Sequence, residues 1–426
     1  MTDLFTLILQ IGTILLAARI VGTIFRTIRQ PQVVGEMAAG LMLGPSLFGS
    51  LAPHAFVRLF PPAGLDRLNS LSQIGLVLFM FLVGLSVHPK QLREYGRAAL
   101  VVGQASIAVP FALALGLAWF LYPRVSSPSV HFSHFALFMG AAMSITAFPV
   151  LARILSQSGL LDKPLGALGI ACSAVGDVTG WCMLAYIVMV VRAAQTAMPF
   201  WLTLAGSLAF ALIMLFGVRR WLRALERHYV THGGFTENSI SLILLFVLAS
   251  ALITEALGIH LLFGAFLAGC VMPRHGAFVQ DLRERFESIT VVLLLPLYFA
   301  FTGLRTSIGL VKGPQMWGYC AAIIVVAVLG KLGGTMAAGR AAGMSWRDSA
   351  ALGALMNTRG LMELVILNIG LDIGVISPAV FSMMVLMALV TTFMTTPLLH
   401  TLRAIASRAP LPAGQQGSFT VAGQEP

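Results

Sequence analysis

Long runs of apolar residues alternate with short polar connections along almost the whole chain. Thirteen runs come close to or exceed the length that a helix needs to cross a hydrocarbon layer about 30 Å thick. They lie near residues 3–25, 32–50, 69–87, 98–121, 133–156, 164–191, 199–218, 237–257, 259–272, 287–304, 315–341, 347–371 and 378–401. The run 259–272 is the shortest. This pattern predicts an all-α polytopic membrane protein with about 13 transmembrane helices.

Two of the apolar runs are interrupted by polar or helix-breaking residues. The run 133–156 contains Ser144, Thr146 and Pro149, and the run 347–371 contains the sequence LMNTRGLMELV. Paired interruptions in corresponding halves of a membrane protein indicate an inverted repeat with its binding site near the midplane. We therefore predict an inverted repeat with two broken crossing helices, and one extra N-terminal helix outside the repeat.

A single carboxylate, Asp177, lies inside the apolar run 164–191, in the sequence SAVGDVTGWCMLA. An acid at the centre of a bilayer costs at least about 2.5–3.5 kcal/mol on insertion scales, so such a residue marks a functional site by default. The run 315–341 carries one central charge in the same way, Lys331. A buried acid beside a broken helix is typical of an ion-coupled transporter.

Composition agrees with a membrane protein, because hydrophobic residues make up 58% of the chain and charged residues only 10%. The net charge of +11 does not indicate nucleic-acid binding, since the basic residues form short clusters between apolar runs. With the N-terminus outside, eighteen Lys and Arg residues fall on the cytoplasmic side and six outside, the bias that orients membrane proteins. We therefore expect a multi-pass protein, of a bacterial inner membrane, with a cytoplasmic C-terminus.

The residues around Asp177 suit a monovalent cation, Na⁺ or K⁺. Asp177 supplies the negative charge that a dehydrated metal ion needs, and Ser173, one turn earlier on the same helix face, can add a hydroxyl. Unwinding around Thr146 would free backbone carbonyls, which are tolerated at this depth only where they line a cavity. Competition between a proton and a metal ion for one carboxylate is a complete exchange mechanism. The alternative is a buried acid that only forms a structural ion pair with Lys331.

Other intramembrane charges are interpreted as supports. Lys331 can pair with the Asp177 helix, neutralise the helix crossing or carry a proton, and we favour a structural role. Arg359 and Glu363, four residues apart, can pair along one helix face and lock the second broken helix. Glu36 is interpreted as a packing and capping residue. We find no enzyme motif and expect no cofactor besides the transported ions.

These residues and motifs together resemble the monovalent cation:proton antiporter-2 family, over residues 5–400, and are most similar to the branch that includes the plant cation/proton exchangers. The matching motifs are GEMAAGLMLGPS (35–46), FMFLVGLSVHPKQL (79–92), ITAFPVLARIL (145–155), SAVGDVTGW (173–181), GKLGGT (330–335) and LMNTRGLMELVILNIGL (355–371). The resemblance implies that Asp177 carries cation and proton, that Thr146 lines the unwound crossing and that Lys331 is the basic partner.

The resemblance also implies an organisation. It predicts a sodium/hydrogen exchanger-like transmembrane domain at 1–402 and a homodimer with a dimer-forming domain. A core, with helices at about 98–191 and 315–401, would move as an elevator. Residues 403–426, rich in Gly, Pro and Gln, predict a short disordered cytoplasmic tail. We expect no soluble regulatory domain in the chain.

Gly176 departs from the family pattern, in which Asp or Asn precedes the essential acid. The Asp-Asp form is associated with electrogenic exchange and the Asn-Asp form with electroneutral exchange. Gly176 brings no second acid, so we expect electroneutral exchange of one cation for one proton. Arg359 stands where the plant branch has Lys, and it keeps the charge.

The sequence therefore predicts a secondary active antiporter, not an enzyme, that exchanges Na⁺ or K⁺ for H⁺ across a lipid bilayer. One alternative is a non-transporting sensor or scaffold that keeps the antiporter fold; Gly176 favours it, and the intact Asp177, Thr146 and Lys331 oppose it. Another is a symporter or exporter of an organic ion on a related scaffold.

Overall fold

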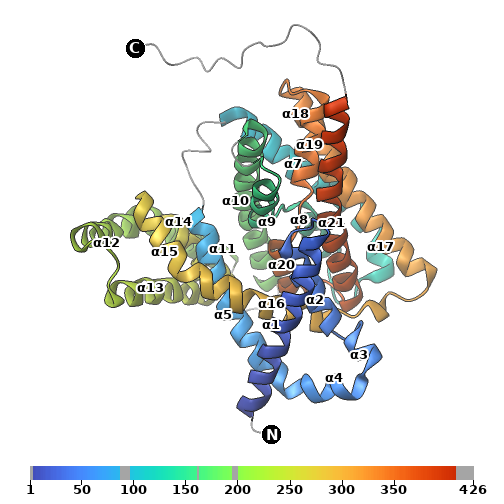
Figure 1. The fold of residues 1–426 in the computed structure, drawn as a ribbon, viewed down its shortest axis with the longest axis horizontal. Coiled ribbons are helices and arrows are strands. Elements are labelled where there is room, and N and C mark those ends of the chain that lie inside the picture. Colours follow the sequence, from blue (N-terminus) through green and yellow to red (C-terminus); the bar gives the residue numbers. More distant parts are fainter. Residues whose placement is uncertain (1–2, 87–95, 161–162, 194–199, 409–426) are drawn as a thin grey trace.

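The computed structural model describes residues 3–86, 96–160, 163–193 and 200–408, and the regular elements within those ranges are all helices (Figure 1). The first half of the chain contains α1 (Asp3–Thr27), α2 (Gln32–Leu43), α3 (Phe48–Leu51), α4 (Pro53–Leu59), α5 (Pro62–Ser86), α7 (Gly96–Val125), α8 (Phe132–Ser144), α9 (Phe148–Gln157), α10 (Pro164–Ala193) and α11 (Phe200–Leu212). The π-helical turn η1 (Ile213–Val218) joins α11 to α12 (Arg219–His232).

The second half contains α13 (Glu237–Ala256), α14 (Leu261–Val271), α15 (Gly276–Ile289), α16 (Leu295–Arg305), α17 (Gly313–Val328), α18 (Gly334–Ala341), α19 (Trp346–Met356), α20 (Leu361–Asp372) and α21 (Pro378–Arg408). Two further π-helical turns are η2 (Thr290–Leu294) and η4 (Leu329–Gly333), and η3 (Ile308–Leu310) is a 3₁₀ turn. The predicted all-α fold is confirmed.

Eleven helical stretches of the described chain are long and apolar enough to cross a membrane, and the number is twelve if the bent pair α19 and α20 forms one span. The predicted run 259–272 forms α14, which has only 11 residues. At 1.5 Å per residue this helix is about 16 Å long, roughly half of the hydrocarbon thickness. The count of thirteen transmembrane helices is therefore not confirmed.

At the carboxyl end, α21 continues to Arg408, beyond the predicted domain boundary at 402. Residues 403–408, predicted as part of a disordered tail, are therefore the last residues of α21. The rest of that tail, 409–426, lies outside the described residues.

The helices pack in two groups. The first group consists of α1, α2, α5, α13, α14, α15 and α16, and the second group of α7, α8, α9, α10, α17, α18, α19, α20 and α21. Within the first group, α2 and α16 cross closely: a Cβ on Gly40 would lie 2.3 Å from the carbonyl oxygen of Phe299. Glycine is required there, as in many close helix crossings in membranes. The second group is formed by helices within 96–193 and 313–408; that it moves as the predicted core stays a prediction.

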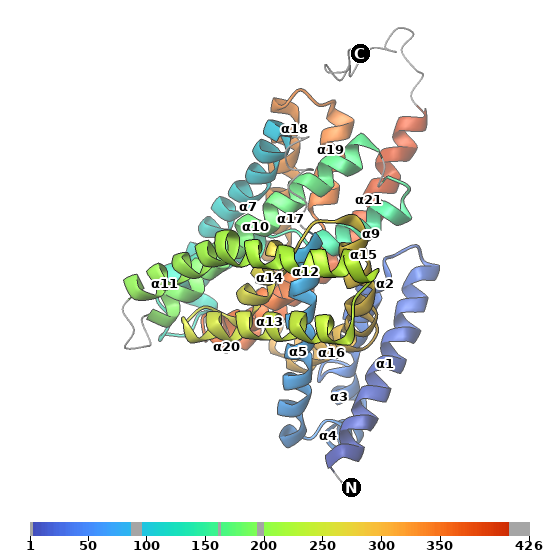
Figure 2. The same cartoon turned by 90° about the vertical axis from the view of Figure 1, so that its left-hand side faces the viewer.

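The two ends of the described chain lie at opposite ends of the molecule. In Figures 1 and 2, α1 begins at the bottom of the view, while α18 and the last turns of α21 lie at the top.

Candidate ion-binding site

Both predicted breaks are present, and they contact each other. Residues 145–147 separate α8 from α9, and residues 357–360 separate α19 from α20, which are bent by 46° relative to each other. Pro149 lies in the first turn of α9, where its missing N–H costs no hydrogen bond. The Ala147 N–H donates to the carbonyl oxygen of Thr358 over 3.0 Å. Because an unpaired backbone group in lipid costs several kcal/mol, each break stabilises the other.

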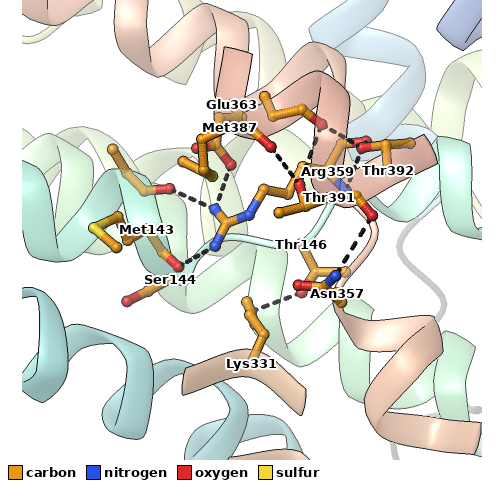
Figure 3. A network of polar contacts seen from close by, with 12 residues as sticks. Met143, Ser144, Thr146, Lys331, Asn357, Arg359, Glu363, Met387, Thr391 and Thr392 are labelled. Carbon is orange, nitrogen blue, oxygen red and sulfur yellow. Dashed lines mark hydrogen bonds and ion pairs between the residues drawn. The ribbon is translucent and has the colours of Figure 1, made fainter. Parts of the chain in front are cut away.

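Arg359 fills the space between the second break and the end of α8 (Figure 3). Its guanidinium donates to the carbonyl oxygens of Ala142 at 3.0 Å and Met143 at 2.6 Å. Carbonyls in the last turn of a helix lack partners inside the helix and carry partial negative charge. Glu363 lies 2.5 Å from the same guanidinium, in an ion pair that is fully buried. Arg359 therefore ties α20 to α8 as well as to its own helix.

Lys331 lies in the π-helical turn η4 and is fully buried. Its Nζ donates to the Thr146 hydroxyl over 2.7 Å, and that hydroxyl donates to the carbonyl oxygen of Met356, at the end of α19, over 3.0 Å. Lys331 and Thr146 thus connect the two breaks (Figure 3). A hydroxyl has one donor and two acceptor lone pairs, so Thr146 keeps one lone pair for an ion.

Asp177 is buried in α10, with 2% of its surface exposed, and its Oδ1 atom has no hydrogen-bond partner. Lys331 is close enough to act on Asp177 electrostatically, but the two side chains form none of the ion pairs found in the described chain. Buried polar atoms in proteins are nearly always partnered. Glu363 also has an oxygen, Oε1, without a hydrogen-bond partner, but its other oxygen is paired with Arg359. Asp177 takes part in no such pair, which suits an ion-binding residue better than a structural ion pair.

The two neighbours of Asp177 on α10 differ in what they offer. Ser173, one turn earlier, is fully buried, and its hydroxyl donates to the carbonyl oxygen of Ile170 over 3.3 Å. Both of its lone pairs remain able to accept. A Cβ on Gly176 would lie 3.9 Å from Cδ1 of Ile107 on α7, an ordinary contact distance. Position 176 therefore has room for at least the first carbon of a side chain.

Threonines of α21 complete the polar network, and the sequence analysis did not single them out. The Arg359 N–H donates to the Thr392 hydroxyl over 3.0 Å, and the Asn357 amide donates to the Thr391 carbonyl over 3.4 Å. The signal that could have found them is the pair of Thr-Thr dipeptides in the last apolar run. Their hydroxyls are buried and, in lipid, need partners.

These features define a class of protein. Two discontinuous helices cross inside one helix group, held by buried Arg and Lys residues. Asp177, a buried acid outside the ion pairs of the described chain, lies on α10, which contacts α8, α9 and α19. Membrane transporters of the inverted-repeat kind hold their ions in such places. In the described chain, no three His, Cys, Asp or Glu residues gather as a site for a resident metal.

The chain belongs to the sodium/hydrogen exchanger family: the model of the family described as "Sodium/hydrogen exchanger, transmembrane" matches residues 14–402. It is 41% identical to the Na(+)/H(+) antiporter NhaS4 of Synechocystis over 93% of this chain and 97% of that protein. It is 40% identical to cation/H(+) antiporter 17 of Arabidopsis thaliana, over 92% of this chain and 48% of that protein. The predicted resemblance to cation:proton antiporters is thereby confirmed.

Two more comparisons agree. K(+)/H(+) antiporter 1 of Saccharomyces cerevisiae is 35% identical over 91% of this chain and 45% of that protein. The solved structure of the sodium proton antiporter MjNhaP1 from Methanocaldococcus jannaschii matches with a TM-score of 0.63, covering 95% of this chain and 98% of that one at 14% identity. The structural match shows a shared fold.

Proposed function

We propose that the protein is a secondary active antiporter that exchanges a monovalent cation, Na⁺ or K⁺, for H⁺ across a lipid bilayer. The observation that carries this proposal is Asp177, a buried acid with an orphaned carboxylate oxygen. It lies in the helix group that contains the two broken helices. The names of the relatives, which include Na⁺/H⁺ and K⁺/H⁺ antiporters, support the class of substrate.

Asp177 would carry both ions in turn. Either a proton or a cation neutralises the carboxylate, so loading one ion requires release of the other. The free lone pairs on Ser173 and Thr146 would supply further oxygen ligands, together with carbonyls of the breaks. Lys331 would hold Thr146 in place and would not carry the ion, while Arg359 and Glu363 would fix the second break.

Exchange would be electroneutral, with one cation moved for each proton, because Gly176 adds no second acid beside Asp177. Access would alternate by an elevator movement of the second helix group past the first, and the first group would form the interface of a homodimer. The bias of basic residues supports an outside N-terminus and a cytoplasmic C-terminus, and the membrane would be a bacterial inner membrane.

A second candidate is a sensor or scaffold that keeps the fold without transporting, and Gly176 is the observation that favours it. The test is purified protein in proteoliposomes that contain a pH-sensitive dye. Adding Na⁺ or K⁺ should evoke a dye response that is absent from protein-free liposomes, and the full series of alkali cations gives the selectivity. Well-folded protein without a response to any alkali cation would favour the sensor or scaffold.

A further inference from the structure

Two ion pairs join the two helix groups at the carboxyl ends of α10, α13, α16 and α20. Arg192 of α10 pairs with Glu255 of α13 at 3.0 Å, and Arg305 of α16 pairs with Asp372 of α20 at 2.6 Å. In each pair, one partner belongs to the first group and the other to the second. Buried His260, between α13 and α14, lies within electrostatic range of Glu255, Arg192 and Asp372. The two pairs therefore belong to one cluster.

Beneath this cluster, α20 contacts α16 through a buried polar network. Asn368 is 3% exposed, and its amide donates to the Tyr298 hydroxyl over 3.0 Å and to the Thr302 hydroxyl over 2.9 Å. Arg305 donates to the Asn368 side-chain oxygen over 3.1 Å. These bonds fit one register of the two helices, because a shift along α16 would leave buried polar atoms unpaired.

The opposite end of the interface between the groups is held differently. Arg153 of α9 donates to the Gln32 side-chain oxygen over 3.2 Å, and Gln32 donates to Glu36 over 3.0 Å. The Gln30 amide donates to the carbonyl oxygen of Phe393 over 3.2 Å. Both of the ion pairs between groups that the described residues contain lie at the first end.

We propose that Arg192, Glu255, Arg305 and Asp372 form a latch, here the outer latch, that keeps the two helix groups together on the outside and breaks when Asp177 becomes accessible from there. The proposal rests on the proposed function and on the predicted orientation. The four side chains are between 24% and 46% exposed, so water can solvate them when the pairs separate. Each exposed ion pair of this kind changes the equilibrium between joined and separated helix groups by about two- to fivefold. This small effect suits a contact that must open in every transport cycle.

Two adjacent residues after α16 offer a matched pair of cross-links. The Ser307 N–H donates to the Ser382 hydroxyl of α21 over 3.1 Å, which joins the two groups. The Ile308 N–H donates to the Ser46 hydroxyl over 3.0 Å, and Ser46 follows α2 in the first group. Standard bond lengths then place the Cα atoms of each pair within about 7 Å, near disulfide reach.

The cross-linking arm uses protein in which the four native cysteines are replaced by Ser. Oxidised Ser307→Cys/Ser382→Cys should lose exchange and regain it on reduction. Oxidised Ser46→Cys/Ile308→Cys, the control, links the segments that follow α2 and α16, two helices of the first group, and should keep exchange. Full exchange by the oxidised Ser307–Ser382 pair would overturn the proposal, whereas an inactive reduced protein would instead count against the proposed function.

The labelling arm requires no transport. Thr302→Cys places a thiol beneath the outer latch, and an impermeant thiol reagent added outside reports how often that side opens. Glu255→Gln and Asp372→Asn should each raise the labelling rate about two- to fivefold, and the two together more. Asp281→Asn, which breaks a pair within α15, is the matched control and should leave the rate unchanged. An unchanged rate in the double variant would overturn the outer latch.

Discussion

Replacing Asp177 with Asn removes one negative charge from the buried site and keeps the shape of the side chain. The Oδ1 atom has no hydrogen-bond partner, and Asp177 takes part in none of the ion pairs of the described chain. The variant therefore breaks no ion pair of the described chain. It gives up the electrostatic attraction of Lys331, and in return the cost of burying a charged carboxylate disappears. We expect Asp177→Asn to unfold at the same temperature as the wild type or at a higher one.

Transport by Asp177→Asn should fall far below the wild-type level. A cation and a carboxylate about 4 Å apart attract each other by about 4 kcal/mol at an effective dielectric constant near 20. Losing that attraction weakens cation binding by about a thousandfold. At a cation concentration near the wild-type KM, exchange should no longer be detectable.

Dye-loaded proteoliposomes and thermal unfolding of the same preparation measure both quantities. Asp281→Asn on α15, an acid paired with Arg285 four residues on, is the control and should exchange like the wild type. Exchange by Asp177→Asn near the wild-type rate would refute the role of Asp177 as carrier. Lost exchange together with a clearly lower unfolding temperature would show instead that Asp177 holds the fold.

Three further predictions concern the same site. At low pH a larger fraction of Asp177 is protonated and cannot bind a cation, so the apparent KM for the cation should rise as pH falls, by up to about tenfold per pH unit. A KM that does not change with pH would contradict competition at Asp177. Lys331→Ala should lower stability by about 1.5–3 kcal/mol, the range for a hydrogen bond to a charged group, and Lys331→Arg should restore part of it; unchanged exchange and melting in Lys331→Gln would end its supporting role. Since Gly176 adds no acid, Na⁺/H⁺ exchange should not depend on a membrane potential clamped with K⁺ and valinomycin, and a net current would make Lys331 the candidate for a second proton carrier.

The helical architecture was largely predictable from the sequence, because a backbone in lipid must satisfy its own hydrogen bonds and the bilayer sets the length of each span. The runs 3–25 and 237–257 match α1 and α13 within two residues at each end. The run 259–272 was the weak case, since α14 packs among other helices of its group and need not span the hydrocarbon alone.

The two breaks were also predictable, from Pro149 and from the polar cluster in the run 347–371. Lys331 was expected near the helix crossing, but the individual contacts of Lys331 and Arg359 with other helices were not predictable. Lys331 donates to Thr146 across 185 positions of sequence, and Arg359 reaches the end of α8 across 217. Spacing along one helix predicts pairs such as Arg359 with Glu363, because residues four apart share a face. Contacts between helices depend on packing that a single sequence does not contain.

The contacts found in the structure give a reason why a single ionisable side chain, Asp177, would change its charge during transport. Arg359 has Glu363 and two carbonyl oxygens, and Lys331 has the Thr146 hydroxyl. These contacts lie inside the second helix group, so that group can move without breaking them. Asp177 belongs to the same group, yet its Oδ1 atom has no partner there. A cycle in which only Asp177 exchanges a proton for a cation carries the same charge in both directions, and this is the physical reason to expect electroneutral exchange.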